Sequence, residues 1–209
     1  MKLKKFLAAT LAATMVMSSA MTVCAGYYDS SSSSSSSSES STAEPEDVQV
    51  ANAPIAVAGT TVKTTISGAY AAKKVQGTAV ITPLAEVKAS LGLTGSQQPA
   101  ITIYDTDPVK SPKALACVNA AAEALGAEVL TSLNVDLGAK ENGKWVTLSN
   151  GSVALTAGLP KDADPTKTYS AICVQPGGVV TILEDQDNNP LTVTFEVMAG
   201  IGTYAIVAK

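Results

Sequence analysis

The sequence contains no histidine and no arginine among its 209 residues. Without imidazole, the Ser-His-Asp and Cys-His arrangements of nucleophilic catalysis are excluded, as are zinc sites built on histidine. Between residues 48 and 209, eleven lysines stand against thirteen carboxylates, so this part of the chain is nearly neutral. Because nucleic-acid binding depends on clustered positive charge, we expect no nucleic-acid partner. Paired-carboxylate chemistry survives these exclusions, which leaves a carboxylate-based hydrolase as an alternative function.

Aromatic side chains are also scarce, at 4% of the chain. Sugar-binding sites stack sugar rings on exposed aromatic side chains, whereas the core of a domain this size normally absorbs the few aromatics that it has. We therefore expect core packing for these residues. Trp145, near a predicted hairpin turn, and Tyr104, beside Asp105, are the candidates for a sugar site if any are exposed.

Long hydrophobic runs are missing, apart from one near the N-terminus. Lysines precede an apolar run over residues 6–17, which is shorter than the roughly 20 residues that a membrane span needs. This pattern predicts a secretory signal peptide over residues 1–25, with cleavage between Ala25 and Gly26 and a secreted, extracellular product without a membrane span. The alternative is a lipid anchor on Cys24, which would hold the chain at the outer face of the cell membrane.

Residues 26–47 form a low-complexity segment that is rich in serine and carries five carboxylates and no lysine. Such a segment cannot bury enough apolar area to offset its conformational entropy, so we expect a disordered linker. Composition alone favours a plain spacer, and an O-glycosylated stalk is the functional alternative.

Two segments of the remaining chain carry helix signals. Residues 83–91 begin with proline and stop before Gly92, and residues 111–126 begin with Ser-Pro, end with glycine and carry a stripe rich in alanine. The rest is rich in Val, Ile and Thr and interrupted by Gly, Pro, Asn and Asp. This texture predicts strands at residues 48–57, 60–66, 77–82, 100–104, 128–137, 144–148, 152–156, 168–175, 179–183, 191–197 and 203–207.

These elements predict an α+β fold in which two or so helices pack on a β-rich body. A mixed α/β lobe over residues 48–140 continues through a hairpin, without a linker, into a β-sandwich-like lobe over residues 141–209. We therefore expect one composite unit over residues 48–209, and not two separate domains.

The C-terminal strands resemble a known family. Within residues 145–208, the stretches NGSVALTAGLP, TYSAICVQPGGVVTIL, LTVTFEV and GTYAIV are similar to the C-terminal immunoglobulin-like β-sandwich modules of Gram-positive secreted and cell-surface proteins. Residues 192–195 and 203–207 match the last strands of those modules, while Gly200-Ile201-Gly202 replaces the aromatic-serine pair that usually precedes the tyrosine. The resemblance implies an antiparallel Ig-like sandwich that serves as a spacer or support, with no activity to carry over.

One acidic stretch has the spacing of a calcium-binding loop. Asp185, Asp187 and Asn189 occupy its first, third and fifth positions, and Glu196 occupies the twelfth. Pro190 stands where that loop requires glycine, and the residues that follow have the pattern of a strand and not of a helix. We therefore expect a hairpin turn and no cofactor, and keep a calcium site as the alternative.

Cleavage after Ala25 leaves two cysteines, Cys117 and Cys173. Secretion permits a disulfide bond between them. Their predicted positions, on the flank of a helix and on a strand, favour two separate small thiols, because a disulfide requires α-carbons within about 7 Å of each other.

Together, these patterns predict a secreted, non-enzymatic module of a Gram-positive bacterium. We expect it to act in surface display, adhesion or protein contact, with an extracellular protein or a cell-wall component as its partner. A calcium- or small-ligand-binding extracellular domain is the first alternative, and the carboxylate-based hydrolase is the second.

Overall fold

The computed structural model describes residues 20–21 and 48–209. The predicted cleavage site at Ala25 and Gly26, the lipid anchor at Cys24 and the linker over residues 26–47 lie outside these residues. The described elements are β1 (Ala20–Met21), β2 (Val48–Gln49), β3 (Pro54–Val57), β4 (Thr60–Lys63), β5 (Ser67–Ala71), β6 (Thr78–Ala79), α1 (Leu84–Ser90), β7 (Gln98–Asp105), α2 (Pro112–Leu125), β8 (Glu128–Glu141), β9 (Lys144–Thr147), β10 (Ser152–Gly158), β11 (Tyr169–Gln175), β12 (Val179–Glu184), β13 (Thr192–Met198) and β14 (Gly200–Ala208).

The strands form one large sheet, one small sheet and a separate hairpin. The large sheet has the order β1-β12-β11-β14-β8-β7-β5-β2, with β9 paired to the far end of β8. The small sheet has the order β13-β10-β6, and β3 pairs with β4. Neighbouring strands are antiparallel except for β5 and β7, which run parallel. Strands from both halves of the chain therefore share the large sheet, since β8 lies between β7 and β14.

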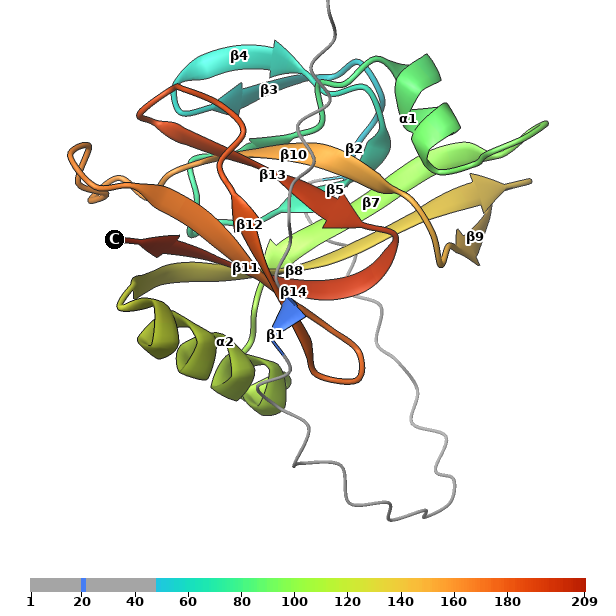
Figure 1. Cartoon of the computed structure of the whole chain (residues 1–209). Helices are drawn as coiled ribbons and strands as arrows, with labels where there is room; N and C mark the ends of the chain where they lie inside the picture. Colours follow the sequence, from blue (N-terminus) through green and yellow to red (C-terminus); the bar gives the residue numbers. More distant parts are fainter. Residues whose placement is uncertain (1–19, 22–47) are drawn as a thin grey trace, which may run out of the picture.

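The elements lie in layers around two apolar clusters. Figure 1 shows α2 on one side of the large sheet, and β3, β4 and α1 on the other side with the small sheet. The main core lies between the two sheets and draws residues from Ile55 near the start of the body to Ala208 near its end. A second cluster lies between α2 and the large sheet. The predicted lobes over residues 48–140 and 141–209 thus contribute to a single core.

Helix α2 follows from its local sequence. Pro112 begins the helix after Ser111, and Gly126 ends it in the left-handed conformation at φ 63°, where glycine has no Cβ penalty. Its buried side chains are small and include Val118, Ala121 and Ala122. Because small side chains permit close approach, the helix packs directly on Ile172, Val174 and Val207 of the sheet.

The β-rich α+β fold expected from the sequence is confirmed, with two helices among the described residues. The hairpin between β8 and β9 is also confirmed, and its turn places Asn142 at φ 51° and Gly143 at φ 77°, as a tight hairpin requires. Residues 48–57 are not one strand, because a turn with Asn52 at φ 64° separates β2 from β3. Strand β5 was missed, since Ser67-Gly68 at its start has weak strand propensity. The Ig-like resemblance stays a prediction.

The predicted Cys117–Cys173 disulfide is wrong. Cys173 is a free, buried thiol on β11 and faces the main core. Cys117 lies on α2 and belongs to the second cluster, on the opposite face of the sheet. Because adjacent strand residues point to opposite faces, Ile172 and Val174 face α2 while Cys173 points away from it.

No helix in the described part of the chain is long and apolar enough to cross a membrane.

Candidate functional site

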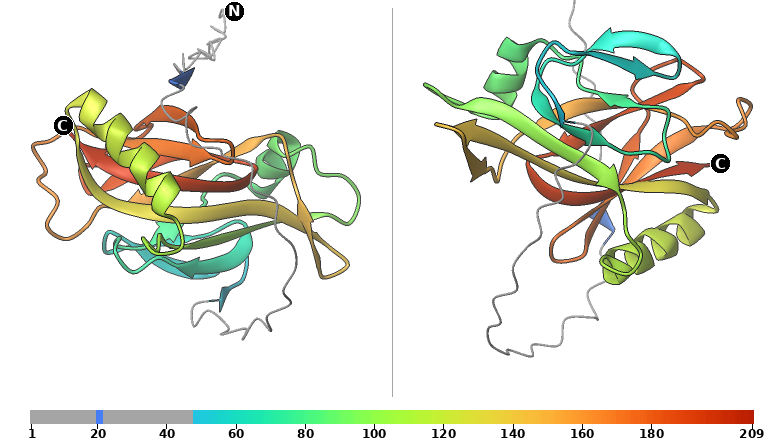
Figure 2. Two further views of the ribbon diagram at one scale, coloured as in Figure 1. Left: turned by 90° about the horizontal axis from the view of Figure 1, so that it is seen from below. Right: turned by 180° about the vertical axis from the view of Figure 1, so that it is seen from behind.

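One face of the large sheet is only partly covered. Helix α2 packs over β11, β12 and the neighbouring ends of β8 and β14. The left view of Figure 2 shows α2 crossing one end of the sheet, while β8 continues beyond the helix towards β9. We call the surface formed beyond the helix by Thr102, Tyr104, Asp136, Gly138, Trp145 and Ile201 the open face.

Strand register brings these residues together from distant parts of the sequence. Residues Leu133, Val135 and Leu137 of β8 point into the main core, so Asp136 and Gly138 point to the opposite face. Across the strands, Asp136 stands opposite Thr102 of β7 and Ile201 of β14. In the next row, Asn134 stands opposite Tyr104 and Thr203. The open face is therefore built from three adjacent strands of a continuously paired sheet.

Two aromatic side chains flank the open face. Trp145 is 38% exposed and Tyr104 is 44% exposed. A Cβ atom on Gly138 would lie 2.6 Å from Cζ2 of Trp145, which shows that the indole ring lies directly on the backbone of β8 at this glycine. Core packing was the wrong expectation for these two residues, although Tyr70, Tyr169, Phe195 and Tyr204 are buried as expected.

A hydrogen-bond network fixes the end of the open face nearest α2. Thr203 Oγ1 donates to Asn134 Oδ1 at 2.8 Å, and Thr106 Oγ1 donates to the same atom at 3.3 Å. The Asn134 amide donates to Ser111 Oγ at 3.4 Å, next to the first residue of α2. Asn134 thus joins β7, β14 and the start of α2, and its oxygen is already occupied.

Asp136 is the polar group of the open face whose hydrogen-bonding capacity is unused. Its Oδ1 is buried and has no hydrogen-bond partner among the described residues. Burial raises the pKa of this half-buried carboxyl above its ordinary value, because the charged form loses hydration. A carboxylate in this position lacks a donor that a bound molecule could supply.

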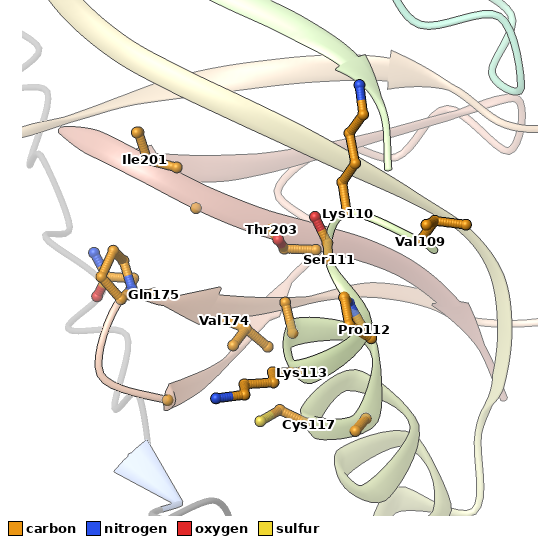
Figure 3. Close-up of a pocket in the computed structure, with 15 residues that line it drawn as sticks. Val109, Lys110, Ser111, Pro112, Lys113, Cys117, Val174, Gln175, Ile201 and Thr203 are labelled. Carbon is orange, nitrogen blue, oxygen red and sulfur yellow. The ribbon is translucent and has the colours of Figure 1, made fainter. Parts of the chain in front are cut away.

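A pocket of about 890 Å³ adjoins the open face. It lies between the start of α2, the turn from β11 to β12 and the start of β14, and Figure 3 shows its lining. Its walls are mainly apolar, with Ser111 and Thr203 side by side near the Asn134 network. Ile201 belongs to both the pocket and the open face, so the two surfaces are continuous.

The residues of the predicted calcium loop lie in the connection from β12 to β13, on another part of the molecule. Asp185 Oδ1 accepts hydrogen bonds from the backbone N–H of Thr194 at 2.9 Å and of Asp187 at 3.1 Å. Asn189 Oδ1 accepts from the N–H of Leu191 at 3.1 Å. The side chain oxygens therefore serve the turn itself.

Asp187 completes this set of bonds. It accepts from the Thr194 hydroxyl at 2.6 Å and from the Thr192 hydroxyl at 3.0 Å. Glu196 lies on β13, paired across from Ala154, and not in the loop. Within residues 20–21 and 48–209, no group of three or more His, Cys, Asp or Glu side chains is arranged to hold a metal ion. The calcium site stays a prediction.

Other paired carboxylates hold turns. Asp105 accepts the backbone N–H groups of Lys73 and Lys74, at 3.0 and 3.1 Å, and so ties the end of β7 to the preceding loop. Asp164 accepts both the N–H and the hydroxyl of Thr166, and the N–H bond in particular lowers the pKa of Asp164. These are the backbone contacts that short acidic side chains make in turns.

The chain matches no protein-family model, no curated protein and no solved structure.

The sequence analysis singled out Trp145 and Tyr104 but missed Asp136 and Ile201. The strict alternation of Leu133, Val135 and Leu137 was visible in the sequence and would have placed Asp136 on the face opposite the core. Nothing in the sequence indicated that β14 would pair with β8 and bring Ile201 beside it.

Proposed function

We propose that this chain is a non-catalytic binding module that acts outside a Gram-positive cell, in surface display, adhesion or protein contact. The observation that carries this proposal is the open face. Trp145, Tyr104 and Ile201 expose aromatic and apolar surface on one side of a rigid sheet, where the cost in exposed apolar area suits a contact surface.

The build of the open face supports contact through side chains. Strands β7, β8 and β14 each pair with neighbours on both sides, so their backbone groups are occupied within the sheet. Rigid strands hold the exposed side chains in fixed positions, which lowers the entropy lost on binding. The C-terminal strands, with their resemblance to Ig-like modules, would serve as the support for this face.

The location belongs to the same proposal. The chain is exported by its signal peptide, begins at Gly26 after cleavage and is carried on the serine-rich linker, with a lipid anchor at Cys24 as the alternative. Mass spectrometry of the N-terminus of the exported chain tests this. A terminus at Gly26 supports release, and a diacylglycerol-modified Cys24 would show anchoring instead.

Binding of the exported chain to isolated Gram-positive cell walls and to defined extracellular proteins tests the function. The double variant Trp145→Ala, Ile201→Ser removes the exposed surface of the open face. The matched control, Ile81→Ser with Leu191→Ser, removes side chains that are 53% and 51% exposed elsewhere. We expect the first variant to lose at least tenfold in bound protein and the control to bind like the parent. Equal binding by all three proteins, or turnover of a polysaccharide or peptide by the parent, contradicts the proposal.

A further inference from the structure

We propose that the open face binds a neutral linear glycan, whose sugar rings stack on Trp145 and Tyr104 and whose hydroxyls donate to Asp136. This inference rests on the proposed function and names its ligand.

The spacing of the two aromatic side chains fits a chain of sugars. The Trp145 ring lies at Gly138, and Tyr104 stands opposite Asn134 in the strand pairing. Four residues of β8 separate these two rows, which is about 13 Å at roughly 3.4 Å per residue. One sugar ring is too short to contact both aromatics, whereas a short oligosaccharide reaches from one to the other.

The surface between the aromatics is low and polar. Gly138 has no side chain and Thr102 has a small one, so no ridge separates the Trp145 ring from Tyr104. The electron-rich faces of aromatic rings attract the C–H groups on a flat sugar face. Asp136 lies in the row between the two aromatics, where it can accept from the equatorial hydroxyls of a sugar.

The need of Asp136 for a donor separates glycans from other extended ligands. Its Oδ1 is unpartnered, and a proline-rich peptide has few N–H groups to offer it. Peptides that add a strand need a free sheet edge, which β7, β8 and β14 do not have. Each sugar carries several hydroxyl donors, and a neutral glycan avoids the repulsion that an acidic one would meet at this carboxylate.

The chain contains one tryptophan, so its fluorescence reports on the open face alone. The probes are neutral cello-, xylo-, manno- and chito-pentaose, with an oligogalacturonate pentamer as the acidic comparison. Titration of the exported chain is followed by Trp145 emission and by calorimetry. We expect at least one neutral pentasaccharide to shift the emission to shorter wavelength and to release heat, with the acidic pentamer binding at least tenfold more weakly.

Variants separate stacking and hydrogen bonding from folding. Trp145→Ala and Asp136→Asn should each weaken binding by about tenfold or more, since a bond to a charged group contributes roughly 1.5–3 kcal/mol and 1.4 kcal/mol is tenfold. Trp145→Phe should retain most of the affinity, because it keeps an aromatic face. Leu191→Ser should bind like the parent. Circular dichroism verifies that each variant is folded.

The outcomes distinguish this inference from the proposed function. If no neutral pentasaccharide binds at millimolar concentration, or if Trp145→Ala binds it unchanged, the inference is wrong. Binding of cell walls or of a defined protein through the open face, without binding of any pentasaccharide, would overturn the glycan and leave the binding module standing. Loss of all binding through the open face overturns both.

Discussion

At the scale of single residues, Asp136 and Gly138 show how the open face departs from ordinary sheet design. A half-buried carboxylate without a donor lowers stability, and a glycine in the middle of a strand gives up side-chain packing. At Gly138 the missing side chain is what lets the Trp145 ring lie on the strand. Both residues are explained by a surface kept for binding, because such sites commonly sacrifice stability.

Asp136→Asn should stabilise the fold at neutral pH by up to about 1 kcal/mol, since an unpartnered buried polar group costs about 1–3 kcal/mol and this carboxyl is only half-buried. Burial raises the pKa of Asp136, so the folded state holds its proton to higher pH than the unfolded state does. The parent therefore loses stability as pH rises above the ordinary carboxyl range, and the variant does not. Melting temperatures at pH 3 and pH 7 test this.

The matched control for this experiment is Asp105→Asn. Asp105 accepts two backbone N–H groups, so its replacement should lower the melting temperature at pH 7. If Asp136→Asn lowers it as well, then Asp136 has a structural role and its unpartnered oxygen does not burden the fold.

The thiol of Cys173 is the second residue whose surroundings decide its chemistry. Burial raises its pKa to about 11. Because the thiolate is the reactive form, Cys173 should resist alkylation at pH 8 in the folded protein and react within minutes once the protein is unfolded in guanidinium. Mass spectrometry of the peptide that contains Cys173 measures the modified fraction, and rapid labelling of the folded protein would contradict the buried position.

At the scale of elements, α2 and the β12–β13 connection each do one structural task. The alanine stripe of α2 lets the helix lie close to the sheet, where Ala121 and Ala122 are 1% and 3% exposed. The acidic connection between β12 and β13 uses its oxygens to hold its own backbone and the hydroxyls of β13. Local sequence patterns identified both segments, but only the packing shows what each one contacts.

Ala121→Leu should lower the free energy of unfolding by about 1–3 kcal/mol, because overpacking a tight interface forces side chains and backbone to shift. Ala124→Leu lies on the exposed side of the same helix and should change stability by less than about 0.5 kcal/mol. Urea denaturation measures both. Equal effects of the two substitutions would show that α2 is not closely packed on the sheet.

Asp187→Ala should lower the free energy of unfolding by about 1–3 kcal/mol, because it leaves the hydroxyls of Thr192 and Thr194 without their acceptor. The loss should be the same with calcium and with chelator, since these bonds already occupy the carboxylate. Asn188→Ala, an exposed neighbour, is the control. A calcium-dependent rise in melting temperature that disappears in Asp187→Ala would instead support the calcium loop.

At the scale of the whole molecule, the two halves of the body cannot be separated without opening the core. Strand β8 of the first half pairs with β14 of the second half over the length of the sheet. The main core contains Leu133 and Val135 together with Phe195 and Tyr204. The resulting sheet holds the open face in place, because its residues come from β7, β8, β9 and β14.

Unfolding should therefore follow one transition, with the same midpoint by Trp145 fluorescence and by far-ultraviolet circular dichroism. A chain that ends at residue 140 should fail to fold, because it lacks β14 and the small sheet. Two separate midpoints, or a folded truncated chain, would show that the predicted lobes are independent domains.

The sequence by itself determined the missing chemistries, the near-neutral charge of the body, the two helices and most of the strands. These are local properties, set by composition, by glycine and proline positions and by periodicity within ten or so residues. Tertiary structure alone decided that Cys117 and Cys173 lie on opposite faces of the sheet, that Trp145 and Tyr104 are exposed, and that Ile201 stands beside Asp136. Strand order depends on contacts between residues far apart in the chain, and local preference does not encode which strand becomes the neighbour of which.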